Sequence, residues 1–195
     1  MNKLELMRIM LINSSVGASA VRNQGSAGIA KSIRDTLIKK FDLDSFFRHL
    51  KAKDEQVFKN YLRNLTNKII QQNNNIRWGT ARKCINLVLR SAVYNRFISH
   101  HYGLKQRDYK SGGLVDKLEL PLDSYSIKGI KKDCRKYKLG FDYKSFPKFS
   151  IISLNQENKL ESNYYQKRAE LIAGKRKICR VDLDLCYWRN QNQSD

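Results

Sequence analysis

The chain has 195 residues and a mass of 22.8 kDa, which fits one domain or two small lobes that share a core. Lys and Arg number 38 against 18 Asp and Glu, so the net charge is +20, while a hydrophobic fraction of 41% excludes a disordered basic tail. Basic charge among many aromatic residues is the usual electrostatic pattern of nucleic-acid-binding proteins. We therefore expect a nucleic-acid partner rather than a merely solvated basic surface.

Several other classes fit the sequence less well. No run of 18 or more apolar residues occurs, and Glu5 and Arg8 interrupt the apolar patch of Met1–Leu11, so neither a membrane span nor a signal peptide is expected. The four cysteines form no CxxC pair, and the three histidines do not lie at zinc-ligand spacing from them. We expect a cytoplasmic protein with reduced thiols, no metal, no cofactor and no membrane partner.

Few segments alternate between apolar and polar residues, and there are only two prolines. This pattern favours helices over strands. We predict a mainly α, compact helical protein that forms a single globular domain over residues 1–195. The alternative division has two small lobes with a cleft, 26–115 and 1–25 with 116–195.

Apolar residues at helical spacing place the individual helices. The expected helices are 26–40, a segment capped by Asp44 or Ser45, 54–71, 80–102, a short one beginning near Asp123, and 162–174. Thr80 is expected to cap helix 80–102 and Gly103 to end it. Segment 150–154 fits a short strand, and for 179–188 a helix is favoured over a strand.

Two polar clusters precede predicted helices. Arg22, Asn23 and Gln24 combine a phosphate-binding cation with two amides that can pair with a base edge, although ordinary polar residues at the start of a helix are the favoured explanation. In the second cluster, Arg77–Lys83, amides at a glycine-opened helix start can bind phosphate. Its indole, Trp78, offers a stacking surface, unless it is a core residue beside solvated cations.

Two further stretches carry carboxylates. Asp123 follows Pro121 at a predicted helix start, where a carboxylate can serve as an N-cap, as a catalytic group, or as both. Asp182 and Asp184 are more simply explained as partners of local arginines than as metal ligands.

The segment Leu120-Pro121-Leu122-Asp123-Ser124-Tyr125, followed by Ile127 and Ile130, resembles the Pro-Val-Asp-Thr-His-Val segment of helix–hairpin–helix DNA glycosylases. Gly79-Thr80-Ala81-Arg82-Lys83 is similar to a loose version of that family's glycine-lysine hairpin. The family's Leu-Pro-Gly-Val-Gly hairpin is absent, and Lys83 and Asp123 lie 40 residues apart.

The resemblance implies a DNA glycosylase that flips a damaged or modified base out of double-stranded DNA and excises it, in repair or in defence against phage. Asp123 would stabilise the positive charge on the sugar, and Lys83 would be the nucleophile of an accompanying strand cleavage. The residues expected to contact nucleic acid are Arg22, Asn23, Gln24, Arg77, Trp78, Arg82, Arg90, Tyr125 and Lys128.

Two alternatives remain open, and a monomer is favoured in each case. A non-enzymatic nucleic-acid-binding module explains the charge and the aromatic residues without any cleft chemistry. A metal-dependent nuclease that uses Asp182 and Asp184 ranks last, because no further carboxylate or histidine completes a ligand set.

Overall fold

A computed structural model describes residues 1–21, 28–72, 75–145, 150 and 159–189. These residues form α-helices, short 3₁₀ helices and turns without a strand, which confirms the prediction of a mainly α protein. The expected strand 150–154 lies almost wholly outside them. Within this part of the chain, no helix is both long and apolar enough to cross a membrane. The chain divides into two compact units, Met1–Lys105 and Gln106–Asp195, which are described separately here.

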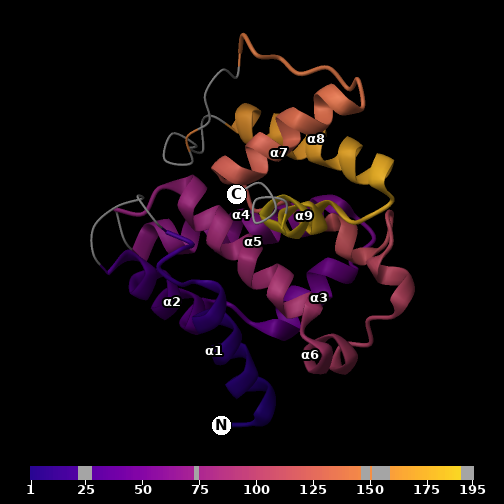
Figure 1. The fold of residues 1–195 in the computed structure, drawn as a ribbon. Coiled ribbons are helices and arrows are strands. Elements are labelled where there is room, and N and C mark those ends of the chain that lie inside the picture. Colours follow the sequence, from indigo (N-terminus) through magenta and orange to yellow (C-terminus); the bar gives the residue numbers. More distant parts are fainter. Residues whose placement is uncertain (22–27, 73–74, 146–149, 151–158, 190–195) are drawn as a thin grey trace. The chain divides into compact units, whose positions relative to one another are not determined.

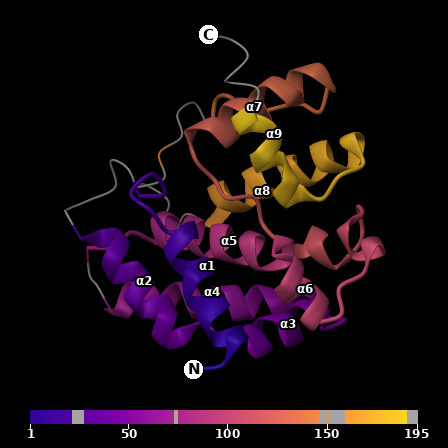
Figure 2. The ribbon, with the colours of Figure 1, turned by 60° about the horizontal axis from the view of Figure 1, so that its bottom comes forward.

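The first unit contains six helices among its described residues (Figures 1 and 2). They are α1 (Lys3–Ser15), α2 (Ile29–Lys40), α3 (Leu43–Lys51), α4 (Glu55–Gln72), α5 (Trp78–Tyr94) and α6 (Arg96–His101). Helices α1, α4 and α6 pack on α5, while α2 packs on α1 and α4, and α3 packs on α4. Because α1 packs inside this unit, the boundary between the units differs from the lobe division that grouped 1–25 with 116–195.

Helix α5 carries the clearest sequence pattern, and its buried side confirms it. The expected apolar stripe, Ala81, Cys84, Ile85, Val88, Ala92 and Val93, is wholly buried. The boundaries differ from the prediction, since α5 begins at Trp78 with Arg77 as an N-cap that makes no side-chain bond, and Thr80 lies inside the helix. The expected single helix 80–102 is interrupted at Asn95, whose Oδ1 accepts the Ile98 amide at 3.0 Å and so starts α6. Gly103 ends α6 with φ of +68°, as expected.

Side chains also determine where α3 begins and where α2 ends. Helix α3 is capped by Asp42, whose Oδ2 accepts the Ser45 amide at 2.6 Å, so the prediction that Asp44 or Ser45 forms the cap was wrong. Arg8 on α1 is buried and closes the end of α2: its Nη1 donates to Phe41 O at 2.6 Å and its Nη2 to Ile38 O at 2.9 Å. A cation at this end of a helix also interacts favourably with the helix dipole.

The second unit contains α7 (Ser124–Lys136), α8 (Lys159–Arg176) and α9 (Leu183–Arg189), with 3₁₀ helices at Gln106–Tyr109, Leu114–Lys117 and Arg180–Asp182. Helix α7 packs on both α8 and α9, and Figure 1 shows α7 and α8 side by side. Tyr165, Ala169 and Ile172 of α8 are buried as predicted. The preference for a helix over a strand near the C-terminus is confirmed by α9 and the 3₁₀ helix before it.

A small residue and a buried carboxylate join α7 to its neighbours. Gly129 of α7 lies directly against the ring of Tyr187 of α9, with no room for a side chain. Asp133 Oδ2 accepts hydrogen bonds from Arg176 Nη2 at 2.6 Å and from Tyr187 Oη at 3.1 Å. Burial, with the nearby Asp133 carboxylate, raises the pKa of the Tyr187 hydroxyl above its usual range.

Candidate nucleic-acid site

Asp123 occupies the N-cap of α7, as the sequence predicts. Its Oδ1 accepts the amides of Tyr125 at 3.0 Å and Ser126 at 2.8 Å, and the Asp123 amide donates to Ser126 Oγ at 2.8 Å. The side chain is only 7% exposed. Reciprocal bonds of this kind form a capping box, which fixes both the helix start and the orientation of the carboxylate.

The backbone that leads to Asp123 is also held in place. Leu120, Pro121 and Leu122 are buried. Gln166 of α8 bonds twice to Leu120, accepting its amide at 3.0 Å and donating to its carbonyl at 2.8 Å. The position of the Asp123 carboxylate is therefore determined by α8 as well as by α7. No local pattern predicts this role for Gln166, because its partner lies 46 residues away.

Tyr125 and Lys128 lie on the first turns of α7. The Tyr125 ring is half-buried and packs against Trp188 of α9 at a centroid distance of 5.0 Å, and Lys128 Nζ lies 6.0 Å from its centroid. Lys128 and Trp188 are exposed. Asp123, Tyr125 and Lys128 thus occupy the same end of α7. Trp188 was missed as a site residue because its place beside Tyr125 depends on the packing of α9.

The second predicted cluster, Arg77–Lys83, lies at the start of α5. Arg77 is exposed and Trp78 is half-buried, whereas Arg82 is only 9% exposed. The Arg82 guanidinium lies 5.7 Å from the Trp78 ring centroid and donates to Thr66 Oγ1 of α4 at 3.1 Å. Arg82 therefore also serves to hold α5 against α4. The interpretation of Arg82 as a fully solvated helix residue was wrong.

Lys83 is 8% exposed, and no other lysine in the described part of the chain is buried. It follows Arg82 on the central helix of its unit, beside Cys84, whose pKa is raised to about 12 by burial, with an opposing effect from the Lys83 charge. Arg90, further along α5, is half-buried. Buried lysines are uncommon, and a desolvated amine is one route to an enzymic nucleophile.

Some predicted residues cannot be placed together. Arg22, Asn23 and Gln24 lie outside the described residues. Lys83 belongs to the first unit and Asp123 to the second, and each is described only within its own unit.

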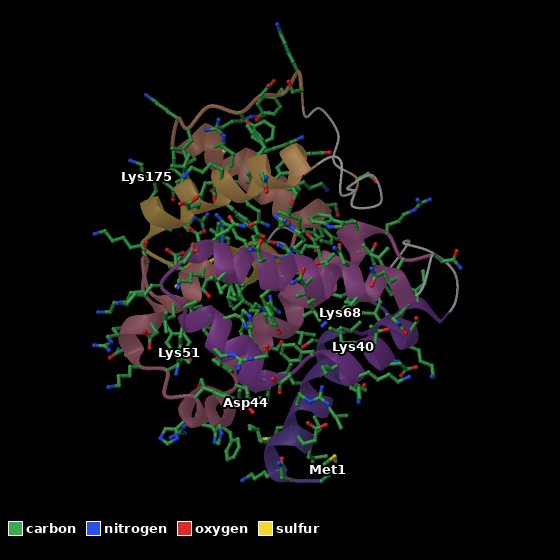
Figure 3. The ribbon with its side chains drawn as sticks, turned by 180° about the vertical axis from the view of Figure 1, so that it is seen from behind. Met1, Lys40, Asp44, Lys51, Lys68 and Lys175 are labelled. Atoms are coloured by element: carbon green, nitrogen blue, oxygen red, sulfur yellow. The ribbon has the colours of Figure 1, made fainter. Side chains whose placement is uncertain are left out.

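Charge is distributed unequally along the chain. The first unit holds 19 Lys and Arg against 6 Asp and Glu, and no acidic residue occurs between Glu55 and Asp108. Lys40 on α2, Lys51 on α3 and Lys68 on α4 are exposed members of this set (Figure 3). The second unit holds 19 Lys and Arg against 12 Asp and Glu. Both units are therefore basic, and the first carries most of the excess.

The remaining acidic pair, Asp182 and Asp184, lies at the starts of two short helices. Asp182 Oδ2 accepts the Cys179 amide at 3.3 Å and so caps the 3₁₀ helix Arg180–Asp182, while Asp184 is buried at the start of α9. Within the described ranges, no group of three or more His, Cys, Asp or Glu could hold a metal ion.

No protein-family model, curated protein or solved structure was found to match the chain.

Proposed function

We propose that the protein is a DNA glycosylase with a helix–hairpin–helix glycosylase-like fold. The observation that carries the proposal is the Asp123 carboxylate, which is buried and oriented by two amides at the start of α7. When a base departs, positive charge develops on the sugar. A carboxylate that is already fixed can stabilise this charge without reorganising, which is the main advantage of preorganised electrostatics.

Lys83 is the proposed nucleophile of an accompanying strand cleavage. Its neutral amine would attack C1′ of the sugar, forming a C–N bond as the glycosidic bond breaks, and the base would leave with the bonding electrons and take up a proton. The lysine–sugar adduct would lose a proton and open its ring by breaking the C1′–O4′ bond. The resulting imine would permit strand cleavage by elimination of the 3′ phosphate. The burial of Lys83 supports this role, because a nucleophile of this kind acts in a site that excludes bulk water.

The basic surface is proposed to hold the DNA backbone. Contacts with phosphates set the position of the duplex but carry no sequence information. Arg77, Trp78, Arg82 and Arg90 of α5, with Tyr125 and Lys128 of α7, are the proposed contacts in the described part of the chain, and Arg22, Asn23 and Gln24 remain predicted contacts. Binding should therefore weaken steeply as the salt concentration rises.

The proposal is tested by measuring base release from duplex oligonucleotides, each of which carries one of a panel of damaged or modified bases. Abasic sites are detected by alkaline cleavage. Asp123→Asn is the sharpest variant, since Asn is an equally good N-cap but carries no charge. We expect base release to fall by about 100-fold or more while the protein stays folded. Lys83→Gln should abolish strand cleavage without alkali. Wild-type rates in Asp123→Asn would refute the role of Asp123.

A non-enzymatic nucleic-acid-binding module is the second candidate. It is favoured by the capping box itself, because satisfying the first amides of α7 is a sufficient structural reason for Asp123. The same assay separates the two functions. A module retains labelled duplex in a mobility-shift gel but releases no base from any member of the panel.

A further inference from the structure

The C-terminal half of α7 and the segment after it form a surface that base excision does not use. Lys131 Nζ lies 5.3 Å from the Phe141 ring centroid and 5.8 Å from that of Tyr143. The Arg135 guanidinium lies 5.3 Å from the Tyr143 centroid, and Arg135 Nε donates to Tyr143 Oη at 2.9 Å. We call Lys131, Lys132, Arg135, Lys136, Phe141 and Tyr143 the Tyr143 platform.

The platform is fixed in place before any partner binds. The Asp142 amide donates to Tyr164 Oη of α8 at 2.7 Å, and Arg168 Nη1 donates to Leu139 O at 2.6 Å. The Phe141 and Tyr143 rings meet at a centroid distance of 4.7 Å. Tyr143 nevertheless remains 38% exposed. An exposed ring held by its hydroxyl and by a neighbouring ring loses little conformational entropy when a ligand stacks on it.

The exposed charge of the platform is positive. Lys132, Arg135 and Lys136 are exposed, and none of them forms an ion pair with a carboxylate in the described part of the chain. Asp133 on the same helix is buried beneath Arg176 and Tyr187.

Two other carboxylates lie near the platform. The Asp142 carboxylate accepts the amides of Lys144 and Ser145, which satisfies it within its own turn. Glu161 of α8 interacts electrostatically with Lys131. The remaining three cations are thus available to an anionic partner.

The platform is separate from the Asp123 end of the same helix. Lys131 and Arg135 follow Asp123 by 8 and 12 residues, which at the rise of an α-helix corresponds to about 12 Å and about 18 Å along α7. A nucleotide bound at Asp123 therefore cannot also cover Tyr143.

We propose that the Tyr143 platform binds a single strand of nucleic acid, with a base stacked on Tyr143 and phosphates held by Lys132, Arg135 and Lys136. Interleaved aromatic and cationic groups fit this ligand, because each nucleotide offers a flat base next to a phosphate. An acidic protein would use the cations but not the exposed ring, and paired duplex bases cannot stack on it. The inference rests on the nucleic-acid-binding part of the proposed function and not on base excision.

The test measures binding of the full chain to a fluorescein-labelled single-stranded oligonucleotide of mixed sequence by fluorescence anisotropy over a salt series. Tyr143→Ala should weaken binding by about fivefold to 100-fold, whereas Tyr143→Phe, which keeps the ring, should stay within about threefold. The triple variant K132Q/R135Q/K136Q should make the negative slope of log K against log salt less steep by roughly 2. The charge-matched control K39Q/K40Q/K53Q removes three exposed cations from the first unit and should change the slope clearly less than the triple variant does.

Each outcome decides a different question. If the wild-type chain binds neither the single strand nor the duplex, the proposed function fails together with the platform. If it binds but the Tyr143 and triple variants bind like the wild type, only the platform fails. If Tyr143→Ala is silent, the triple variant is weakened and polyglutamate competes equally well, the surface recognises acidic protein and the proposal is overturned.

Discussion

The contact between Gly129 of α7 and Tyr187 of α9 can be tested by adding one methyl group. In Gly129→Ala, the new Cβ would overlap Cδ1 and Cγ of Tyr187 and lie 2.5 Å from Cε1. Cγ is at the base of the ring, so a change of rotamer at the tip cannot relieve the clash. Tyr187 must move away from α7, and its hydrogen bond to Asp133 is lost.

Three terms set the magnitude. Overpacking by one methyl group in a close-packed site costs about 1–3 kcal/mol, and losing a hydrogen bond to a charged group costs about 1.5–3 kcal/mol. Ala in place of Gly inside a helix stabilises the folded chain by about 1 kcal/mol. The steric term and the hydrogen-bond term exceed the helix term, so we expect the free energy of unfolding to fall by about 1.5–5 kcal/mol.

Urea unfolding followed by circular dichroism at the helix band measures the change. Gly174→Ala in α8 is a matched control, because a Cβ there meets nothing within 4 Å and only the helix term remains. We expect the control to be stabilised by up to about 1 kcal/mol. If Gly129→Ala is stabilised to the same extent, α9 does not pack against α7 at this position and the reasoning is refuted.

Three other predictions follow from buried or paired groups. Arg8→Met should lower the free energy of unfolding in urea by about 2–4 kcal/mol, because carbonyls at the end of α2 lose their donor; a change below about 0.5 kcal/mol would contradict this. The hydrogen bond from Arg8 lowers the pKa of Glu5, so the pair stabilises the folded chain at neutral pH. That contribution should fade as the pH drops below the ordinary value of 4.5, and a pH series in which Glu5→Gln parallels the wild type would exclude it. Iodoacetamide should modify the half-exposed Cys186 first, since burial raises the pKa of Cys84 and Cys179 to about 12; equal labelling of all thiols in native protein, by peptide mass spectrometry, would refute this.

Local patterns in the sequence predicted most helices and the cap at Asp123, because these features depend on residues within one or two turns. Errors occurred where two local solutions compete. Asp42 and Asp44 are both good caps, but Asp42 caps α3 while the Asp44 carboxylate accepts a hydrogen bond from Tyr102 Oη, 58 residues later. The break at Asn95 was missed because neither glycine nor proline marks it.

The environment of the candidate site was harder to predict. Arg82 and Lys83 flank an apolar stripe, so the sequence places them at the edge of a solvated helix face. Helix α5 is instead buried over most of its circumference, with Arg82 bonded to Thr66 sixteen residues earlier. The pairing of Gln166 with Leu120 is equally non-local. Such contacts depend on the packing of several helices, which no single pattern encodes.

The two hydrogen bonds between Gln166 and the backbone of Leu120 limit which residues can occupy position 166 during evolution. The Leu120 backbone presents one donor and one acceptor. Only a side chain that has both an acceptor and a donor, and that is as long as glutamine, can therefore replace Gln166. Asparagine is one methylene too short, and glutamate lacks the donor. Gln166 is uncharged and only 6% exposed, yet we expect it to tolerate as little substitution as Asp123, because its loss would release the backbone that leads to the carboxylate.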